Sequence, residues 1–140
     1  MQELKDIKNI AGYIDHTCLK PNAVKDDIKR LCREAKEYHF YSVCINPIYV
    51  QFAADLIRNT QVKICTVVGF PTGCHPSEVK VFETEKVLDA GAQEIDMVIQ
   101  VGSLIEGDNQ AVFDDILSVT EICHKRDAIT KVIIETAFLS

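Results

Sequence analysis

Two carboxylates interrupt an apolar run in the middle of the chain: Glu94 and Asp96 lie within EIDMVI (94–99). A carboxylate in such a run must be paired, hydrogen-bonded or protonated, because an isolated buried charge is too costly. Lys131 opens the next β-rich run and is a candidate partner on the matching polar face. An aspartate beside a lysine in a partly dry cavity can carry protons to and from carbon. The alternative interpretation is a structural ion pair that links adjacent strands.

A second polar cluster, Asp15-His16-Thr17, lies near the N-terminus. Successive side chains of a strand alternate between its faces, so Asp15 and Thr17 share one face, where they can orient a substrate oxygen or a catalytic lysine. His16 points the opposite way and is interpreted as a packing histidine. The segment GFPTG (69–73) follows a β-rich run at its carboxyl end, where the loops of α/β proteins bind ligands. It lacks GxGxxG and a Walker lysine, so we expect a tight turn that brings Phe70 over a substrate pocket.

The elements that must position these residues alternate between short β-rich runs and longer helical patterns. The β-rich runs contain Val, Ile, Thr or Cys and predict five strands, at 13–17, 41–46, 63–68, 94–99 and 131–136. Apolar residues recur with helical spacing over 24–35, 50–57 and 112–123, and less regularly over 77–90. Gly91 is expected to stop the helix before it, and Asp108 to cap the helix after it.

This alternation, without a linker or a low-complexity segment, predicts a single α/β domain over residues 1–140, with parallel strands and right-handed helical crossovers. Two architectures fit this order. Five strands in 140 residues suit an open doubly wound sheet of the flavodoxin-like kind. A closed (β/α)8 barrel typically needs about 250 residues. Length alone therefore favours the open sheet.

The chemistry of the strands favours the barrel instead. In an open parallel sheet both faces lie under helices, so its strands read as continuous apolar runs. Here polar residues recur at alternate positions: Asp15 and Thr17, then Ser42, Cys44 and Asn46, then Glu94 and Asp96, then Lys131 and Glu135. One polar and one apolar face are typical of a barrel interior near its mouth. In any single strand, polar groups at a solvated end would give the same alternation.

Composition bounds the partners and the compartment. Lys and Arg number 15 against 21 Asp and Glu, which gives a formal net charge of −6 and no basic stripe for nucleic acid. No run of about 18 apolar residues suggests a membrane span. The N-terminal MQELKDIKNIAGY mixes charges among its apolar residues, unlike a secretory signal. We therefore expect a cytoplasmic protein with no nucleic-acid and no membrane partner.

The six cysteines show neither a CxxC pair nor another short metal-ligand spacing. Most lie in apolar runs or on apolar helix faces, where free cysteine behaves as a small hydrophobe. Cys74 and His75 are two adjacent ligand types without evident partners. We therefore expect six reduced thiols and no metal site.

Five segments together resemble deoxyribose-phosphate aldolase, a class I aldolase of the (β/α)8 barrel type. In the family's order they are IDHTCLKP (14–21), YSVCINP (41–47), VVGFPTG (67–73), EIDMVIQVG (94–102) and KVIIET (131–136). They span nearly the whole chain, and their combination is specific although each piece is short. The residues Cys74-His75-Pro76 depart from the small or Thr-rich residues that the family often has there, and they affect only a loop.

The resemblance implies a lysine Schiff base with acetaldehyde, whose enamine attacks the aldehyde of glyceraldehyde 3-phosphate. The reverse reaction cleaves 2-deoxyribose 5-phosphate. The protonated imine is the electron sink, so no cofactor and no metal are implied. Asp96 matches the family's proton-relay aspartate, and Lys131 matches a lysine near it. Asp15 and Thr17 match polar residues that line the site, and Cys44 matches a cysteine beside the pocket. The implied partner is a small phosphorylated sugar, and a homo-oligomer remains open.

The family's Schiff-base lysine lies on strand six, in a KTSTG-like motif, a second lysine lies on strand seven, and the loops after strands seven and eight hold the phosphate. No KTSTG-like segment occurs in residues 1–140. The expectation is an incomplete TIM barrel, the N-terminal five-eighths, with strands one to five in order, helices on the outer face, and no activity alone. Two alternatives stay open. One is a catalytically dead module that oligomerises through open strand edges, and the other is an open five-stranded domain that binds a phosphate-bearing ligand.

Overall fold

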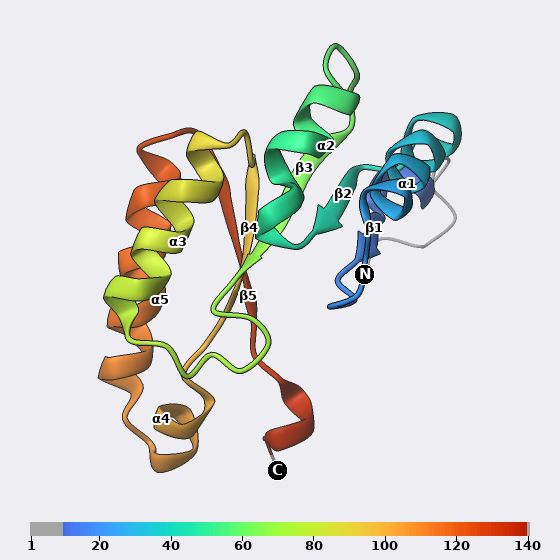
Figure 1. Cartoon of the computed structure of the whole chain (residues 1–140). Coiled ribbons are helices and arrows are strands. Elements are labelled where there is room, and N and C mark those ends of the chain that lie inside the picture. The colour runs from blue at the N-terminus through green and yellow to red at the C-terminus, as the bar shows by residue number, and fades with distance from the viewer. Residues whose placement is uncertain (1–9, 140) are drawn as a thin grey trace.

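The computed structural model describes residues 10–139, which form one parallel sheet flanked by helices (Figure 1). Its strands are β1 (Asp15–Cys18), β2 (Ser42–Ile45), β3 (Lys63–Val68), β4 (Glu94–Val98) and β5 (Ile129–Ile133). They pair in the order β1-β2-β3-β4-β5, and every neighbouring pair is parallel. This order confirms the predicted strands one to five in sequence. It contradicts the open doubly wound alternative, which requires strand one inside the sheet.

Helices connect the strands and cover one face of the sheet. They are α1 (Lys25–Tyr38), α2 (Val50–Leu56), α3 (Ser77–Asp89), α4 (Val101–Glu106) and α5 (Asn109–His124), with 3₁₀ turns η2 (Ile10–Tyr13), η3 (Pro47–Tyr49) and η4 (Thr136–Phe138). α1 packs on β1 and β2, α2 and α3 pack on β3, and α5 packs on β4 and β5. The four predicted helices are confirmed. α4 was not predicted, because its six residues are too few for the apolar spacing of Val101, Leu104 and Ile105 to stand out.

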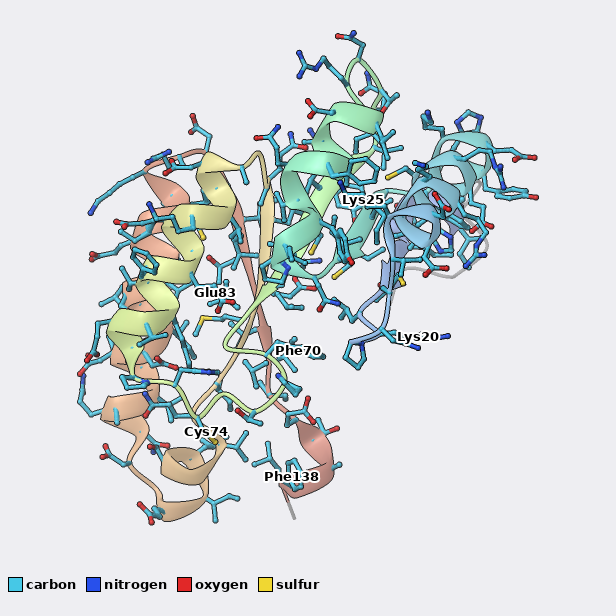
Figure 2. The ribbon with its side chains drawn as sticks, in the orientation of Figure 1. Lys20, Lys25, Phe70, Cys74, Glu83 and Phe138 are labelled. Atoms are coloured by element: carbon cyan, nitrogen blue, oxygen red, sulfur yellow. The ribbon has the colours of Figure 1, made fainter. Side chains whose placement is uncertain are left out.

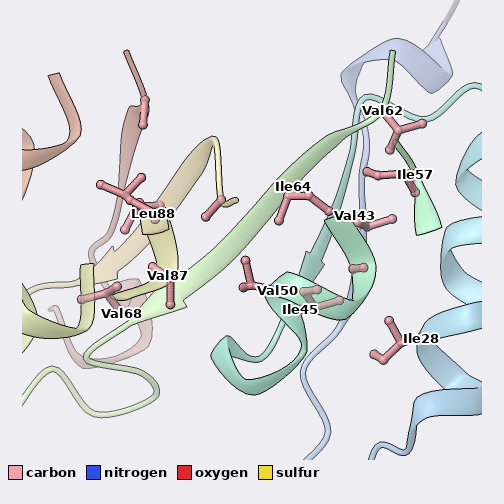
Figure 3. Close-up of a cluster of buried hydrophobic side chains, with 14 of the residues drawn as sticks. Ile28, Val43, Ile45, Val50, Ile57, Val62, Ile64, Val68, Val87 and Leu88 are labelled. Atoms are coloured by element: carbon pink, nitrogen blue, oxygen red, sulfur yellow. The ribbon is translucent and has the colours of Figure 1, made fainter. Parts of the chain in front are cut away.

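The apolar core lies between the helices and the outer face of the sheet (Figure 3). Val43 and Ile45 of β2 and Ile64 of β3 point into it and meet Ile28 of α1 and Val50 of α2. Because side chains alternate along a strand, the residues between these point to the opposite, inner face. The core therefore fixes which side chains are left for chemistry.

Two helix ends follow from single residues. The Asp108 carboxylate accepts a hydrogen bond from the Ala111 amide at 3.1 Å and caps α5, as predicted. α3 ends just before Gly91, whose φ of +107° lies in the region that only glycine adopts easily. The predicted end of α3 at Gly91 and the predicted cap of α5 at Asp108 therefore agree with the structure.

The prediction for the last strand is wrong at both ends. β5 begins at Ile129 and ends at Ile133. Glu135 lies beyond the strand, with a left-handed backbone at φ +52°, and η4 follows it. Glu135 is therefore not an inner-face residue of the sheet. The apolar and polar residues of 131–136 continue the alternation of a strand, but the backbone turns before the pattern ends.

Three expectations about compartment meet the structure differently. All six cysteines are free thiols in the described part of the chain, as expected. Within residues 10–139, no helix has both the length and the apolar character needed to cross a bilayer. Most of the N-terminal segment that was compared with a secretory signal, residues 1–9, lies outside the described residues.

Candidate active site

Lys131 is the centre of a charged cluster on the inner face of the sheet. Its Nζ lies 2.6 Å from Asp15 Oδ2, 3.2 Å from Glu94 Oε2 and 3.1 Å from Asp96 Oδ1. Two of these carboxylates come from β4, next to β5, and the third comes from β1 at the other edge of the sheet. The structure thus brings together the predicted residues Asp15, Asp96 and Lys131.

Strand register and sheet curvature explain this convergence. Asp96 and Lys131 are direct partners across β4 and β5, so their side chains share a face. Asp15 reaches the same lysine from the opposite edge, which requires the sheet to curl around its inner face. The Ser42 hydroxyl of β2 donates a 2.6 Å hydrogen bond to Asp15 Oδ1. The Asp15 carboxylate is therefore held from both sides.

The cluster keeps its central charges. Burial disfavours the charge on Lys131, but the hydrogen bond to Asp15 and the neighbouring acidic groups outweigh it and raise the pKa of Lys131 above its usual value. Burial likewise opposes the charge on Asp15, yet hydrogen bonds from Lys131 and Ser42 lower the pKa of Asp15. Both groups are charged at neutral pH. A lysine that keeps its proton is a poor nucleophile, so the geometry suits Lys131 to electrostatic work and proton handling.

Glu94 is the most deeply buried member of the cluster, with 4% of its side chain exposed. It accepts a short hydrogen bond from the Tyr41 hydroxyl, and this bond, with burial, raises the pKa of Tyr41. Tyr41, Glu94 and Lys131 line a cavity of about 380 Å³ at the N-terminal end of the strands. Alternation had already placed Ser42 on the polar face, although its hydrogen bond to Asp15 was not predicted. Tyr41 was missed as a neighbour of the cluster, because it lies before β2 and alternation does not point to it.

Two thiols lie beside Asp96 on the inner face. Cys44 of β2 and Cys65 of β3 are register partners, and Cys44 Sγ lies 3.9 Å from Asp96 Oδ2. Both cysteines are buried, and a hydrogen bond with Cys44, reinforced by burial, raises the pKa of Cys65. The three side chains place one metal-ligating atom each within 4.8 Å of one another. Spacing along the chain gave no sign of this group, because strand register, and not sequence distance, brings the residues together.

Asp96 itself is incompletely satisfied. Its Oδ1 atom is buried and accepts no hydrogen bond within the described residues, although Lys131 Nζ lies 3.1 Å away at an ion-pair distance. The orientation of the contact does not make it a hydrogen bond. A buried carboxylate oxygen without a partner is costly in a folded protein, and here the Lys131 ammonium supplies the compensating charge, so Oδ1 can still accept a hydrogen bond from a further donor.

Thr17 and His16 differ in how well they match expectation. The Thr17 hydroxyl donates to the backbone oxygen of Asp15 at 2.8 Å and does not join the charged cluster. His16 lies on the outer face, where its Nε2 is 2.7 Å from Glu34 Oε2 and its ring packs 4.8 Å from that of Phe40. The interpretation of His16 as a packing histidine is confirmed.

Phe70 borders a separate apolar cavity at the carboxyl end of the sheet. The cavity has a volume of about 700 Å³, and Pro71, Ile105, Glu135 and Phe138 also line it. Figure 2 shows Phe70, Cys74 and Phe138 around this end of the molecule. Phe70 also packs against the thiol pair of β2 and β3. The expected turn over a pocket is therefore present, and its pocket is distinct from the cavity beside Lys131.

A second ion pair supports the loop that carries Phe70. Lys80 of α3 and Asp115 of α5 are completely buried against each other, and Lys80 Nζ donates to the Val98 carbonyl at 2.9 Å. The Gly69 amide donates to Glu83 Oε2 at 2.9 Å. α3 thus holds the carboxyl ends of β3 and β4, where the loops of a barrel site begin.

A curled sheet of five parallel strands, with helices outside and a lysine–carboxylate cluster inside, defines part of a (β/α)8 barrel. The chain belongs to the DeoC/LacD aldolase family, whose sequence model matches residues 10–138. The resemblance drawn from five short segments is therefore confirmed.

Several relatives illustrate the match. Deoxyribose-phosphate aldolase of Treponema denticola is 49% identical over 127 residues, which are 91% of this chain and 59% of that protein. The Thermococcus kodakarensis enzyme is 51% identical over 135 residues, 95% of this chain and 60% of its own. The chain thus spans about 60% of the length of these curated relatives.

Solved structures agree in fold. A Coccidioides immitis protein assigned as a deoxyribose-phosphate aldolase has a TM-score of 0.91 at 42% identity, with 94% of this chain and 51% of that chain covered. Deoxyribose phosphate aldolase of Aeropyrum pernix, described as a tetramer, has a TM-score of 0.85 at 34% identity, with 94% and 54% covered. The described strands and helices therefore correspond to about half of these longer chains.

Proposed function

We propose that this chain carries the proton-handling part of a deoxyribose-phosphate aldolase site. The reaction is the reversible aldol cleavage of 2-deoxy-D-ribose 5-phosphate to acetaldehyde and glyceraldehyde 3-phosphate. The observation that carries the proposal is the lysine of β5 held by carboxylates at 2.6, 3.2 and 3.1 Å on the inner face. Membership of an aldolase family and the names of the relatives support it.

In the synthetic direction, a lysine imine of acetaldehyde loses a methyl proton, and the resulting enamine carbon bonds to the aldehyde carbon of glyceraldehyde 3-phosphate. We assign Asp96 as the group that takes this proton and returns it in the cleavage direction. Lys131, kept charged by Asp15, holds the Asp96 side chain by their ion pair on the inner face, where we place the reacting carbon. Thr17, Cys44 and Phe70 are proposed as substrate contacts.

The Schiff-base lysine is proposed to lie in the family's KTSTG-like strand, which residues 1–140 do not contain. Lys131 does not replace it, because its amine stays protonated in the cluster. We therefore expect residues 1–140 alone to be inactive. After treatment with acetaldehyde and borohydride, peptide mapping by mass spectrometry should find no reduced adduct on Lys131. A reduced adduct mapped to that residue would contradict this part of the proposal.

A chimera gives the positive test of the activity. Residues 1–140 replace the matching part of the Thermococcus kodakarensis relative, and glyceraldehyde 3-phosphate formation from 2-deoxyribose 5-phosphate is followed by a coupled assay. The chimera should cleave the substrate, and Asp96→Asn should lower kcat by about 10²–10⁴-fold. Asp89→Asn is the matched control, because Asp89 pairs with Arg126 on the exposed surface. A folded chimera without activity, or equal activity in both variants, would refute the assignment.

Three further expectations belong to the same proposal. Residues 1–140 are taken as a single folding unit, the N-terminal five-eighths of an aldolase barrel. The free thiols fit a reducing compartment such as the cytoplasm. A homo-oligomer is proposed by analogy with the tetramer described for the Aeropyrum pernix relative. Light scattering of the purified chimera measures the last of these, and a monomer would contradict it.

A further inference from the structure

Two cysteines and an aspartate converge on the inner face with spacings close to those of a metal site. Their ligand atoms all lie within 4.8 Å of one another, and Cys44 Sγ is 3.9 Å from Asp96 Oδ2. A tetrahedral zinc ion with bonds of about 2.3 Å to sulfur and 2.0 Å to oxygen places two sulfurs about 3.8 Å apart, and a sulfur and an oxygen about 3.5 Å apart. Movements of about 1 Å or less would complete that geometry.

We propose that Cys44, Cys65 and Asp96 bind a thiophilic divalent cation, with Zn²⁺ as the natural candidate. Two metal–sulfur bonds and one metal–oxygen bond form, and both thiol protons leave to the solvent. Water takes the fourth position, as in zinc sites that have three protein ligands. No oxidant or reductant takes part.

The surrounding charges are compatible with this exchange. Lys131 faces three carboxylates, so the cluster carries an excess of negative charge. Exchange of two thiol protons for one divalent cation leaves that total unchanged. Lys131 approaches Oδ1 of Asp96, whereas Cys44 approaches Oδ2, so one carboxylate can serve both the ammonium and the metal.

The chemistry of the ligands selects the ion. Two thiolates favour soft or borderline cations such as Zn²⁺ and Cd²⁺ over Mg²⁺ and Ca²⁺, which require oxygen ligands. The remaining wall is apolar, since Val67, Leu19 and Phe70 pack around the two thiols. A metal bound here takes an oxygen of Asp96, so we expect it to inhibit the aldolase reaction. That inhibition rests on the proposed function, but the metal binding does not depend on it.

Metal binding to the chain, without any histidine tag, tests the site directly. Zn²⁺ affinity is measured by competition with a chromophoric chelator, and Cd²⁺ binding by thiolate-to-metal absorption. One equivalent should bind. Cys44→Ser and Cys65→Ser should each weaken binding about 100-fold or more, and Asp96→Asn about tenfold. Cys74→Ser, at an exposed cysteine outside the group, should bind like the wild type.

X-ray absorption at the zinc edge of the wild-type chain provides the answer even if a cysteine variant fails to fold. Two sulfur neighbours at about 2.3 Å with oxygen at about 2.0 Å are expected. A shell of nitrogen and oxygen alone, unchanged affinity in folded Cys44→Ser and Cys65→Ser, or no saturable binding would each overturn the proposal. An inactive chimera, measured with no metal added, would count against the proposed function. It would leave the metal site untouched, because metal binding is measured separately.

Discussion

Asp15 on the first strand and Lys131 on the last form a 2.6 Å ion pair, although 116 positions separate them in the chain. Their strands are the two edges of the sheet. The pair therefore spans the inner face, and it can form only because the sheet curls enough to bring its two edge strands together. Ser42 holds one end, and the carboxylates of β4 hold the other. This single ion pair thus links the first and last strands and stabilises the curvature of the whole sheet.

Removal of the central charge should destabilise the fold. Lys131→Met leaves three carboxylates without a counter-charge, and its side chain is 35% exposed, so the cost stays below that of a fully buried pair. We expect the free energy of unfolding in urea to fall by about 2–3 kcal/mol. Lys29→Met is the control, since its ion pair with Asp26 is exposed and should contribute little. Equal stability of Lys131→Met and the wild type would contradict the central role of the lysine.

The dependence of stability on pH should show a plateau that ends at both extremes. The folded pKa of Asp15 lies below its usual 3.8, so its contribution is present above that value and is lost as the pH falls through the folded pKa. The folded pKa of Lys131 lies above its usual 10.5, so its contribution is present below that value and is lost as the pH rises through the folded pKa. Unfolding free energies measured across pH test this. Asp15→Asn should reduce the loss of stability at acid pH. An unchanged loss would show that the Asp15 carboxylate does not stabilise the folded state.

The pair below the Phe70 loop should behave as one unit. Lys80→Met leaves Asp115 buried and charged, which costs about 3–5 kcal/mol. The double variant Lys80→Met/Asp115→Leu should cost clearly less than the two single variants together, because no unpaired charge remains. Thermal or urea unfolding of all four proteins completes the cycle. Strict additivity would show that the two side chains do not interact.

Two glycines allow steric and backbone effects to be separated. Both have positive φ, +68° at Gly73 and +81° at Gly107. A Cβ at Gly73 would lie 1.9 Å from the Ile99 carbonyl oxygen, whereas one at Gly107 would meet nothing within 4 Å. We expect Gly107→Ala to cost about 1 kcal/mol from backbone strain, and Gly73→Ala about 3 kcal/mol or more. If both variants lost a similar free energy of unfolding in urea, the close contact between Gly73 and the Ile99 carbonyl would be contradicted.

Part of the site could be predicted because it follows from local rules. Alternation of side chains and parallel connections place Asp15, Asp96 and Lys131 on one face, and the structure brings them together. Curvature is different, because it depends on every strand pair at once. Tyr41 reaches Glu94 only through that curvature, so no pattern around Tyr41 could announce the contact.

The remaining misses have separate physical causes. Cys44 and Cys65 meet because β2 and β3 pair in one register, and a shift of one residue would send one of them to the opposite face. Sequence spacing carries no such information. Glu135 continues the alternating pattern but has a left-handed backbone, which a non-glycine residue adopts rarely. The pattern of side chains could not reveal where the backbone turns.

The separation of the two faces of the sheet determines where the chain tolerates substitution. Most apolar burial lies between helices and the outer face, so the side chains on the inner face contribute little to the largest hydrophobic cluster. Substitutions at uncharged inner positions should therefore change the lining of this face while the chain still folds. Libraries randomised at Thr17 and Cys44 should retain many folded members, whereas libraries at Val43 and Ile45, in the outer core, should retain few.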